Sequence, residues 1–248
     1  MRTIKLLALL FALLPVMVPA KTRVLFIGDS ITDGAWGNSG GGSKPSSERS
    51  LWDMNHIYGH GYMYLCAAHY QGHFPSKNYE FYNRGISGNT LSDLERRWKD
   101  DAIGIRPDVM SILIDTNDVN EFLKKNEGAF DFESWEKCYR RLLDMSLENN
   151  PNLKLVLCAP FVANTRKMRK STNYEEREML IEGCAEIVKR IARDYKAIYL
   201  PYNKLFKDLI RETSVSQDTY WIWDGIHPTA AGHQQMPDMW IKAVDRKK

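Results

Sequence analysis

Short apolar runs recur along the 248-residue chain and alternate with longer segments in which apolar residues repeat every three to four positions. The first run covers residues 23–27, is apolar after Arg23, and stops at Gly28. This pattern is typical of a strand that is buried on both faces and closed by a turn. We predict further strands at residues 79–83, 109–114, 154–158 and 197–200.

Helical periodicity fills the segments between these strands. Two predicted helices each present one apolar face, made of Trp135, Tyr139, Leu142 and Met145 in the first and of Leu180, Cys184, Ile187, Ile191 and Tyr195 in the second. Strands that alternate with helices favour a parallel sheet covered on both sides. The expected fold class is α/β, a three-layer α/β/α sandwich around a central, mostly parallel five-stranded sheet. In such sheets, ligands bind beyond the carboxyl ends of the strands.

The amino-terminal segment has the pattern of an export signal. Arg2 and Lys5 form a basic start, an apolar run follows over residues 6–14, and small residues come after it. An uncleaved anchor helix is the alternative, but a membrane span needs about 20 consecutive apolar residues, and two prolines interrupt this segment. We therefore expect a cleaved signal peptide (1–20), a single domain (21–248), and a secreted or periplasmic protein without stable membrane insertion.

Charge and cysteine content narrow the classes of partner. The formal net charge is +3, and Lys and Arg are scattered among Asp and Glu, so we expect no nucleic-acid partner. The dense basic cluster at residues 166–170 is interpreted as a solvated loop or helix start. The four cysteines lack the Cys-x-x-Cys pairs of zinc sites and are expected to be buried thiols, although an exported protein could pair two of them.

A segment without periodicity follows the first predicted strand. Residues 35–50 are rich in Gly and Ser, which indicates a long surface loop, either functional or a tolerated insertion. Just beyond it, His56 and His60 have the i, i+4 spacing of metal ligands. Gly59 disfavours a helix there, and no matching carboxylate is evident. We therefore expect no metal site.

The tripeptide Gly28-Asp29-Ser30 lies where the first strand must turn. That turn would expose the Ser30 hydroxyl at the carboxyl edge of the sheet, which suits a nucleophile. A serine before a helix is more often an N-cap, so the tripeptide alone is weak evidence.

An acid and an imidazole, Asp224 and His227, lie three residues apart in the turn-prone segment WDGIHPT. A serine hydroxyl needs a base to take its proton, and a carboxylate on the other imidazole nitrogen fixes the tautomer and stabilises the imidazolium. Alone, His227 could be an ordinary buried histidine. Together with Ser30, the pair forms a candidate catalytic triad.

Two segments between these ends could stabilise an oxyanion. The backbone N–H of Gly88 follows the second predicted strand, and the amide of Asn117 follows the third; the backbone N–H of Ser30 would add to them. Taken singly, Gly88 could be there just to permit a turn, and Asn117 just to cap a helix. All these candidates nevertheless fall at the ends of successive strands, where α/β sheets build their sites.

With these motifs in order, the chain resembles the SGNH or GDSL-type hydrolases, a family of esterases and lipases named for Ser, Gly, Asn and His. The resemblance runs from residue 24 to about residue 233 and rests on GDSIT, NRGISGNT, DTNDV and WDGIHPT. It implies the flavodoxin-like SGNH hydrolase fold, and it implies the same nucleophile, oxyanion donors and acid–base pair.

One position departs from the family pattern, because the third motif normally reads Gly-x-Asn-Asp and Asp115 stands here in place of the glycine. If its side chain points toward the pocket, its charge would oppose oxyanion stabilisation; if it points away, it would cap or pair locally. We expect Asp115→Gly to leave activity intact or to raise it.

Four further residues are candidates for the substrate pocket: Asp29, Asn89, Trp36 and Trp223. Exposed aromatic faces beside a site commonly hold a sugar ring or an acyl chain, although each Trp could instead pack in the core.

The sequence as a whole predicts an exported serine carboxylic-ester hydrolase that acts through an acyl-serine, without a cofactor, on a small-molecule or glycan ester. An acetylesterase acting on O-acetylated carbohydrate is favoured by export and by the family resemblance. A lysophospholipase or thioesterase of the same chemistry is the first alternative. A noncatalytic carbohydrate-binding module on this fold is the second. The sequence does not indicate the oligomeric state.

Overall fold

A computed structural model describes residues 21–35, 57–125, 127–170, 173–213 and 219–246. Its five strands form one entirely parallel sheet in the order β2-β1-β3-β4-β5, which is the flavodoxin-like order. They are β1 (Thr22–Gly28), β2 (Tyr79–Gly85), β3 (Val109–Leu113), β4 (Lys154–Cys158) and β5 (Ile198–Leu200). The predicted α/β fold class is confirmed, and each predicted strand ends within two residues of an observed one.

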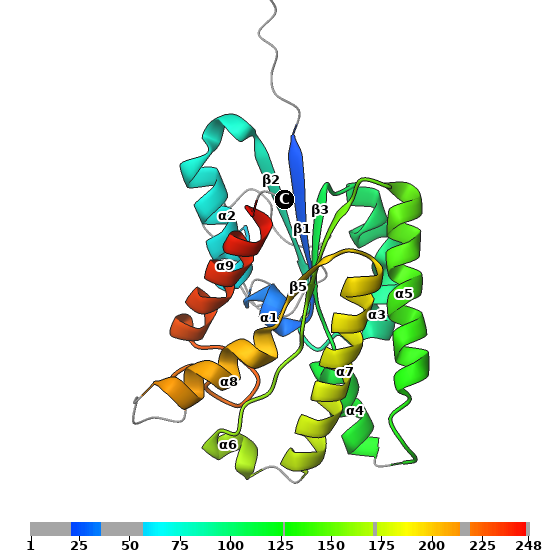
Figure 1. Cartoon of the computed structure of the whole chain (residues 1–248), viewed down its shortest axis with the longest axis vertical. Helices are drawn as coiled ribbons and strands as arrows, with labels where there is room; N and C mark the ends of the chain where they lie inside the picture. The colour runs from blue at the N-terminus through cyan, green and yellow to red at the C-terminus, as the bar shows by residue number, and fades with distance from the viewer. Residues whose placement is uncertain (1–20, 36–56, 126, 171–172, 214–218, 247–248) are drawn as a thin grey trace, which may run out of the picture.

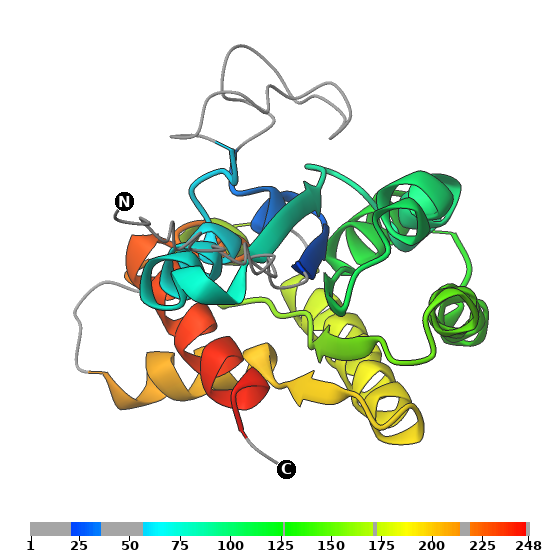
Figure 2. The same cartoon turned by 90° about the horizontal axis from the view of Figure 1, so that it is seen from above.

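Helices cover both faces of this sheet (Figures 1 and 2). One face carries α3 (Leu91–Asp101), α5 (Phe132–Asn149) and α7 (Tyr174–Asp194), and the other carries α2 (Tyr62–His73), α8 (Tyr202–Glu212) and α9 (Ala230–Val244). Three helices follow strands at the carboxyl edge: α1 (Ser30–Asp33), α4 (Thr116–Lys125) and α6 (Arg166–Arg169). Two 3-10 turns, η2 (Pro75–Lys77) and η3 (Ile103–Ile105), precede β2 and β3.

Strand β1 lies between two hydrophobic cores because its side chains alternate between the two faces. Leu25 and Ile27 pack against α3, α5 and α7, whereas Val24 and Phe26 pack against α2 and α9. All four are at most 2% exposed, and burying each such side chain stabilises the fold by about 1.5–3 kcal/mol. The residues that follow β1 therefore project from a strand that is packed on both faces.

The predicted apolar face of α5 was wrong at one position. Trp135, Tyr139 and Leu142 are buried, but Met145 is 36% exposed and Ser146 points inward instead. The Ser146 hydroxyl accepts a hydrogen bond from the Trp98 indole at 3.0 Å and donates to the Leu142 carbonyl at 2.8 Å. A polar residue was accommodated in the core because both of its hydrogen-bonding functions are satisfied.

The four cysteines all lie in the described part of the chain, and none of them forms a disulfide. Cys66, Cys158 and Cys184 are buried and Cys138 is partly exposed. No helix within the described ranges is long and apolar enough to span a membrane. The predicted signal peptide, Trp36, His56 and the loop beyond Ala35 fall outside the described residues.

Candidate active site

Ser30 is the first residue of α1, directly beyond the end of β1. Asp29 is the N-cap of this helix, and its Oδ1 accepts a hydrogen bond from the Ile31 N–H at 2.9 Å. The Ser30 hydroxyl is therefore not needed as a cap. Glycine precedes this turn for a steric reason, because a Cβ at Gly28 would lie only 2.1 Å from the Leu113 carbonyl oxygen of β3.

The structure brings the three candidate triad residues together. Ser30 Oγ lies 2.8 Å from His227 Nε2, and His227 Nδ1 lies 2.8 Å from Asp224 Oδ2. Because a carboxylate only accepts hydrogen bonds, this arrangement assigns the imidazole proton to Nδ1 and leaves Nε2 to accept from the serine. The second Asp224 oxygen accepts from the backbone N–H groups of Ile226 and His227 at 3.0 and 2.8 Å. These bonds hold the carboxylate in position.

The two ionisable partners polarise each other. Burial raises the pKa of Asp224, but hydrogen bonds from the His227 ring and two backbone N–H groups outweigh it and bring that pKa to about 2. The pKa of His227 is raised, chiefly by its hydrogen bond to Asp224, against the lowering effect of partial burial. The negative charge of Asp29 also raises it, and the positive charge of Lys167 lowers it. The raised pKa favours the protonated form of His227, the residue that must accept the serine proton.

Gly88 lies in the loop after β2, at φ 84°, a conformation that favours glycine. The loop is tied to β1, because the Ile86 N–H donates to the Gly28 carbonyl at 3.1 Å. Asn117, at the start of α4, donates from its Nδ2 to the Asn89 carbonyl in the same loop at 3.0 Å. The two candidate oxyanion donors are therefore held on connected segments, the loop after β2 and the first turn of α4. One N–H of the Asn117 amide is not used by the bond to Asn89.

Arg97 connects these elements, although no feature of the sequence marked it. Its Nε donates to the Asn89 side-chain oxygen at 2.8 Å, and its Nη2 donates to the Gly28 carbonyl at 3.2 Å. Its third contact is an ion pair with Asp101 at 2.8 Å, on the next turn of α3. The side-chain oxygen of Asn89 therefore helps to hold this loop in position, and the predicted place of Asn89 in a substrate pocket stays a prediction.

The other predicted pocket residues differ in their surroundings. Asp29 is only 2% exposed, and burial raises its pKa to about 6; its place in a substrate pocket stays a prediction. Trp223 is 50% exposed, and its ring stacks on the His227 imidazole with centroids 6.4 Å apart. Lys167 Nζ lies 4.1 Å from the centroid of the same Trp223 ring. The basic cluster that we interpreted as a solvated helix start therefore reaches the site.

Asp115 points into the protein. It is completely buried, at φ 137°, and within the described residues its carboxyl oxygens have only the thiol of Cys184, on α7, as a weak neighbouring donor. Burial, followed by the nearby Asp118 charge, raises its pKa well above the usual range. Its side chain thus points into the core and not toward the site, and its local partner is the weak Cys184 thiol. Asp118 accepts from the Leu91 N–H through both oxygens at 3.1 Å.

His233 is a second histidine near the site that the sequence did not single out. Its Nδ1 accepts from the Tyr62 N–H at 3.1 Å. Burial, followed by the charge of His227, lowers the pKa of His233 to about 4, so its ring is neutral at neutral pH. This ring is part of the supporting structure and is not a second base.

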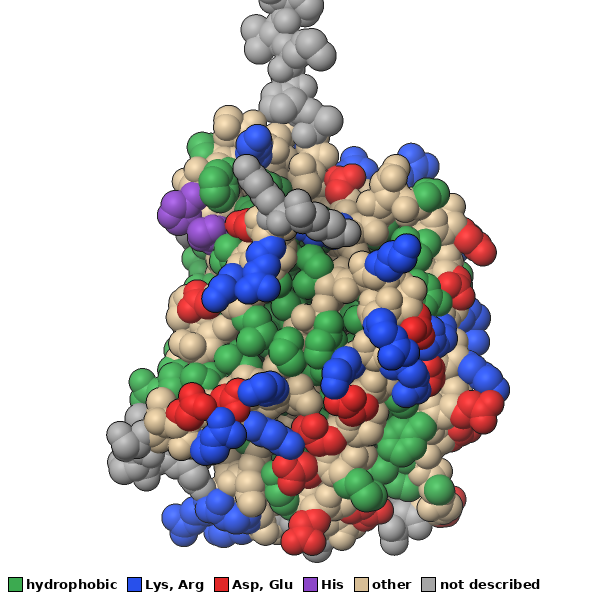
Figure 3. All heavy atoms as spheres, in the orientation of Figure 1, with side chains coloured by type: hydrophobic (Ala, Val, Ile, Leu, Met, Phe, Trp, Pro, Cys, Tyr) green, Lys and Arg blue, Asp and Glu red, His purple; other side chains and the backbone are tan. Residues whose placement is uncertain are grey.

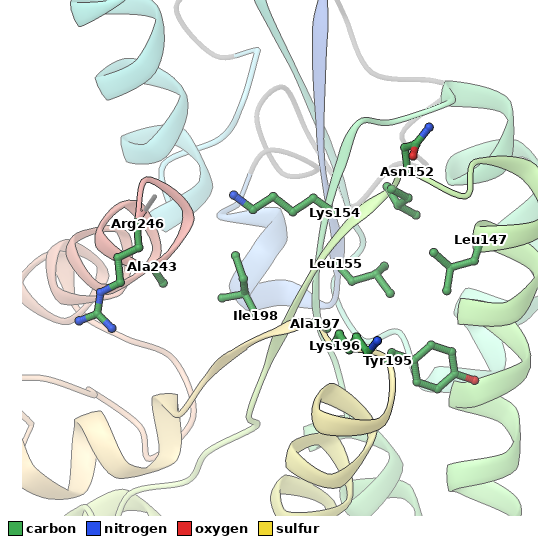
Figure 4. Close-up of a pocket in the computed structure, with 11 residues that line it drawn as sticks. Leu147, Asn152, Lys154, Leu155, Tyr195, Lys196, Ala197, Ile198, Ala243 and Arg246 are labelled. Atoms are coloured by element: carbon green, nitrogen blue, oxygen red, sulfur yellow. The ribbon is translucent and has the colours of Figure 1, made fainter. Parts of the chain in front are cut away.

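A cavity of about 630 Å³ lies at the amino edge of the sheet, opposite the edge that carries Ser30 (Figure 4). Its lining includes Lys154 and Ile198, which begin β4 and β5, together with Arg246 after α9. None of the candidate site residues lines it, and α/β sheets bind their ligands at the carboxyl edge. The chemistry therefore belongs to the Ser30 edge.

A serine, a histidine and an aspartate joined by hydrogen bonds at the carboxyl edge of a parallel sheet are the arrangement of serine hydrolases. The chain belongs to the GDSL-like lipase/acylhydrolase family, whose model matches residues 26–235. This confirms the family resemblance seen in the sequence, and the protein is a carboxylic-ester hydrolase.

Relatives with a stated activity include an acetylxylan esterase of Geobacillus stearothermophilus, which is 28% identical over 228 residues, 90% of this chain and 93% of that protein. A structure of an acetylxylan esterase from the same organism has a TM-score of 0.71 at 25% identity and covers 93% of this chain and 97% of that one. A candidate GDSL-like lipase from Parabacteroides merdae has a TM-score of 0.76 at 28% identity, over 92% and 97%. Catalytic mutants of the Geobacillus enzyme replace a serine, an aspartate and a histidine by alanine.

Proposed function

We propose that the protein is an acetylesterase that removes acetyl groups from O-acetylated carbohydrate, with Ser30 as nucleophile. The observation that carries this proposal is the unbroken hydrogen-bond chain from Ser30 through His227 to Asp224, with 2.8 Å at each step. The catalytic mutants of the Geobacillus acetylxylan esterase support these roles, because their aspartate and histidine are also three positions apart.

Acylation begins when Ser30 Oγ attacks the ester carbonyl carbon and His227 Nε2 takes the hydroxyl proton. The carbonyl oxygen becomes an oxyanion and accepts hydrogen bonds from the Ser30 and Gly88 N–H groups and from Asn117 Nδ2. The Asn117 amide is aimed in advance, because its other N–H is held by the Asn89 carbonyl. The intermediate then collapses, the C–O bond to the alcohol breaks, and His227 returns the proton to the leaving oxygen.

Deacylation repeats the sequence with water. His227 removes a proton from water, the hydroxide attacks the acyl-serine, and the same donors stabilise the second oxyanion. Collapse releases the carboxylic acid and returns the proton to Ser30 Oγ. Throughout, Asp224 stays ionised, because its low pKa keeps it a hydrogen-bond acceptor for the imidazolium.

Two observations support acetylated carbohydrate as the substrate. The relative with 28% identity is an acetylxylan esterase. The Trp223 ring is half-exposed beside His227, where an aromatic face could pack against a sugar. We further propose that residues 1–20 are a cleaved signal peptide and that the mature enzyme acts in the periplasm or outside the cell.

The test is hydrolysis of p-nitrophenyl esters, from acetate to long chains, by the purified mature protein, with Ser30→Ala as the inactive variant. Ser134→Ala, at an exposed position of α5, is the matched control and should behave as wild type. A Ser30-dependent preference for acetate is the expected result. A preference for long chains would reassign the substrate to lipids or thioesters, and hydrolysis that persists in Ser30→Ala would overturn the nucleophile.

A further inference from the structure

A second cavity, of about 620 Å³, opens beside the two proposed oxyanion donors. Gly88 and Asn117 form part of its lining, so it adjoins the position where the ester carbonyl oxygen would lie. The rest of its lining comes from α4 and from the residues around the start of α7, and it includes Lys124, Lys170 and Arg177. A substrate group attached close to the ester could reach this cavity.

Arg177 has no partner for its charge among the described residues. Its Nε and Nη1 atoms are buried, and neither makes a hydrogen bond within the described part of the chain. Burial lowers the pKa of Arg177, and no carboxylate offsets that effect. Other arginines of this chain are paired, for example Arg97 with Asp101 at 2.8 Å and Arg140 with Glu136 at 2.7 Å. Arg177 is partly buried with two guanidinium nitrogens that make no hydrogen bond within the described residues, and buried polar groups are normally hydrogen-bonded, so an anion in the cavity would satisfy them.

The surroundings of Arg177 are positively charged. Lys124 and Lys170 line the same cavity and are both exposed, whereas Glu121 contributes one carboxylate to the lining. Lys167, over the Trp223 ring and three positions before Lys170, adds a further cation near the site. Figure 3 shows Lys and Arg side chains gathered at the end of the molecule that carries α6. This field would attract a negatively charged substrate.

We propose that the cavity binds a carboxylate on the substrate, with Arg177 as its main contact, so that the enzyme deacetylates a glycan that carries uronic acid. This rests on the proposed acetylesterase function. A carboxylate is the acidic group that sugars themselves carry, and guanidinium N–H groups match its oxygens. Because the cavity shares Gly88 and Asn117 with the oxyanion site, the uronate lies on the acetylated sugar or on its neighbour.

The experiment compares two substrates of nearly equal size: an O-acetylated methyl glucuronoside and the same acetylated methyl glucoside, which has a neutral hydroxymethyl group in place of the carboxylate. For the wild type, we expect kcat/KM to favour the uronate about ten- to a hundredfold, the effect of one hydrogen-bonded charge. Arg177→Gln should bring the ratio close to one. Arg177→Lys should keep part of the preference because it keeps the charge.

Arg190→Gln is the matched control, because Arg190 is on the same helix and pairs with Glu136 away from the cavity. It should keep the wild-type ratio. Equal kcat/KM for the two substrates in the wild type would overturn the proposal, as would an Arg177→Gln variant that loses both activities alike. If p-nitrophenyl acetate is still hydrolysed in a Ser30-dependent way, only the carboxylate-binding proposal has failed. If it is not, the proposed esterase function has failed as well.

A second measurement does not depend on any variant folding. If the cavity recognises the carboxylate by charge, added salt should reduce kcat/KM for the uronate while leaving that for the neutral glucoside nearly constant. A parallel decline for both substrates would contradict the anionic subsite.

Discussion

The ammonium group of Lys167 and the ring of Trp223 are in cation–π contact, 4.1 Å from nitrogen to ring centroid. The same ring stacks on the imidazole of His227, so one exposed side chain connects a surface cation to the proposed base. The charge of Lys167 lowers the pKa of His227, opposing the larger effect of Asp224. Lys167 and Asp224 thus shift the pKa of His227 in opposite directions.

Removing the cation should move the acidic limb of the pH profile upward. Catalysis needs neutral His227, and Lys167→Gln removes a charge that disfavours the imidazolium, so the His227 pKa rises further. The variant should lose more activity than wild type on the acidic side and little at alkaline pH. The measurement is kcat/KM against pH, with Lys189→Gln, an exposed residue paired to Glu186, as control. A limb that stays in place or moves down would refute the coupling.

The opposite shift is expected for Asp224→Asn. The amide cannot stabilise the imidazolium as the carboxylate does, so the His227 pKa falls and the acidic limb moves to lower pH. The plateau value of kcat should nevertheless drop by roughly 10⁴, because the tautomer with Nδ1 protonated is no longer enforced. The pH dependence of kcat for p-nitrophenyl acetate tests both effects. Near-normal turnover would show that Asp224 only shapes its loop.

Asn117→Ala should lower kcat by roughly 10²–10³ with little change in KM, as expected when one oxyanion donor is lost. Asn117 also holds the loop through the Asn89 carbonyl, so thermal unfolding must be measured beside the kinetics. Asn152→Ala, at an exposed position before β4, is the control. A lower melting temperature with unchanged kcat would assign Asn117 to structure alone.

Asp115→Gly should stabilise the protein, by roughly 1–3 kcal/mol, because it removes a strained φ and a completely buried carboxyl group that has only the weak thiol donor of Cys184 beside it within the described residues. The gain should increase with pH. The folded-state pKa of Asp115 is raised, so the wild type loses stability as pH rises above the unfolded-state pKa of about 3.9, whereas the variant does not. Urea unfolding at pH 5 and pH 8 measures this, and a less stable variant at both values would disprove it. Activity should be intact or higher.

The five strands could be predicted because strands buried on both faces are short, continuous apolar runs ended by turns. Ser30, Asp224 and His227 stood out because their chemistry is unusual at the ends of such runs. Met145 and Ser146 could not be told apart in the same way. They are adjacent on the helix, and the choice depends on a hydrogen bond from Trp98 that no periodicity encodes.

The supporting residues were hidden for a related reason. Arg97 matters through its contacts with Gly28 and Asn89, and these come together only when the loops fold over α3. Arg177 looks like any helix-surface arginine until packing leaves it without a carboxylate. When a side chain acts through residues that are distant in the sequence, no regular spacing in the sequence reveals its role.

The proposed nucleophile and base are 197 positions apart, one at the end of the first strand and the other after the last. A ribosome must therefore synthesise nearly the whole chain before the pair exists, and a product truncated before residue 227 cannot be active. Regained ester hydrolysis would consequently report complete refolding more strictly than any spectroscopic signal from its helices.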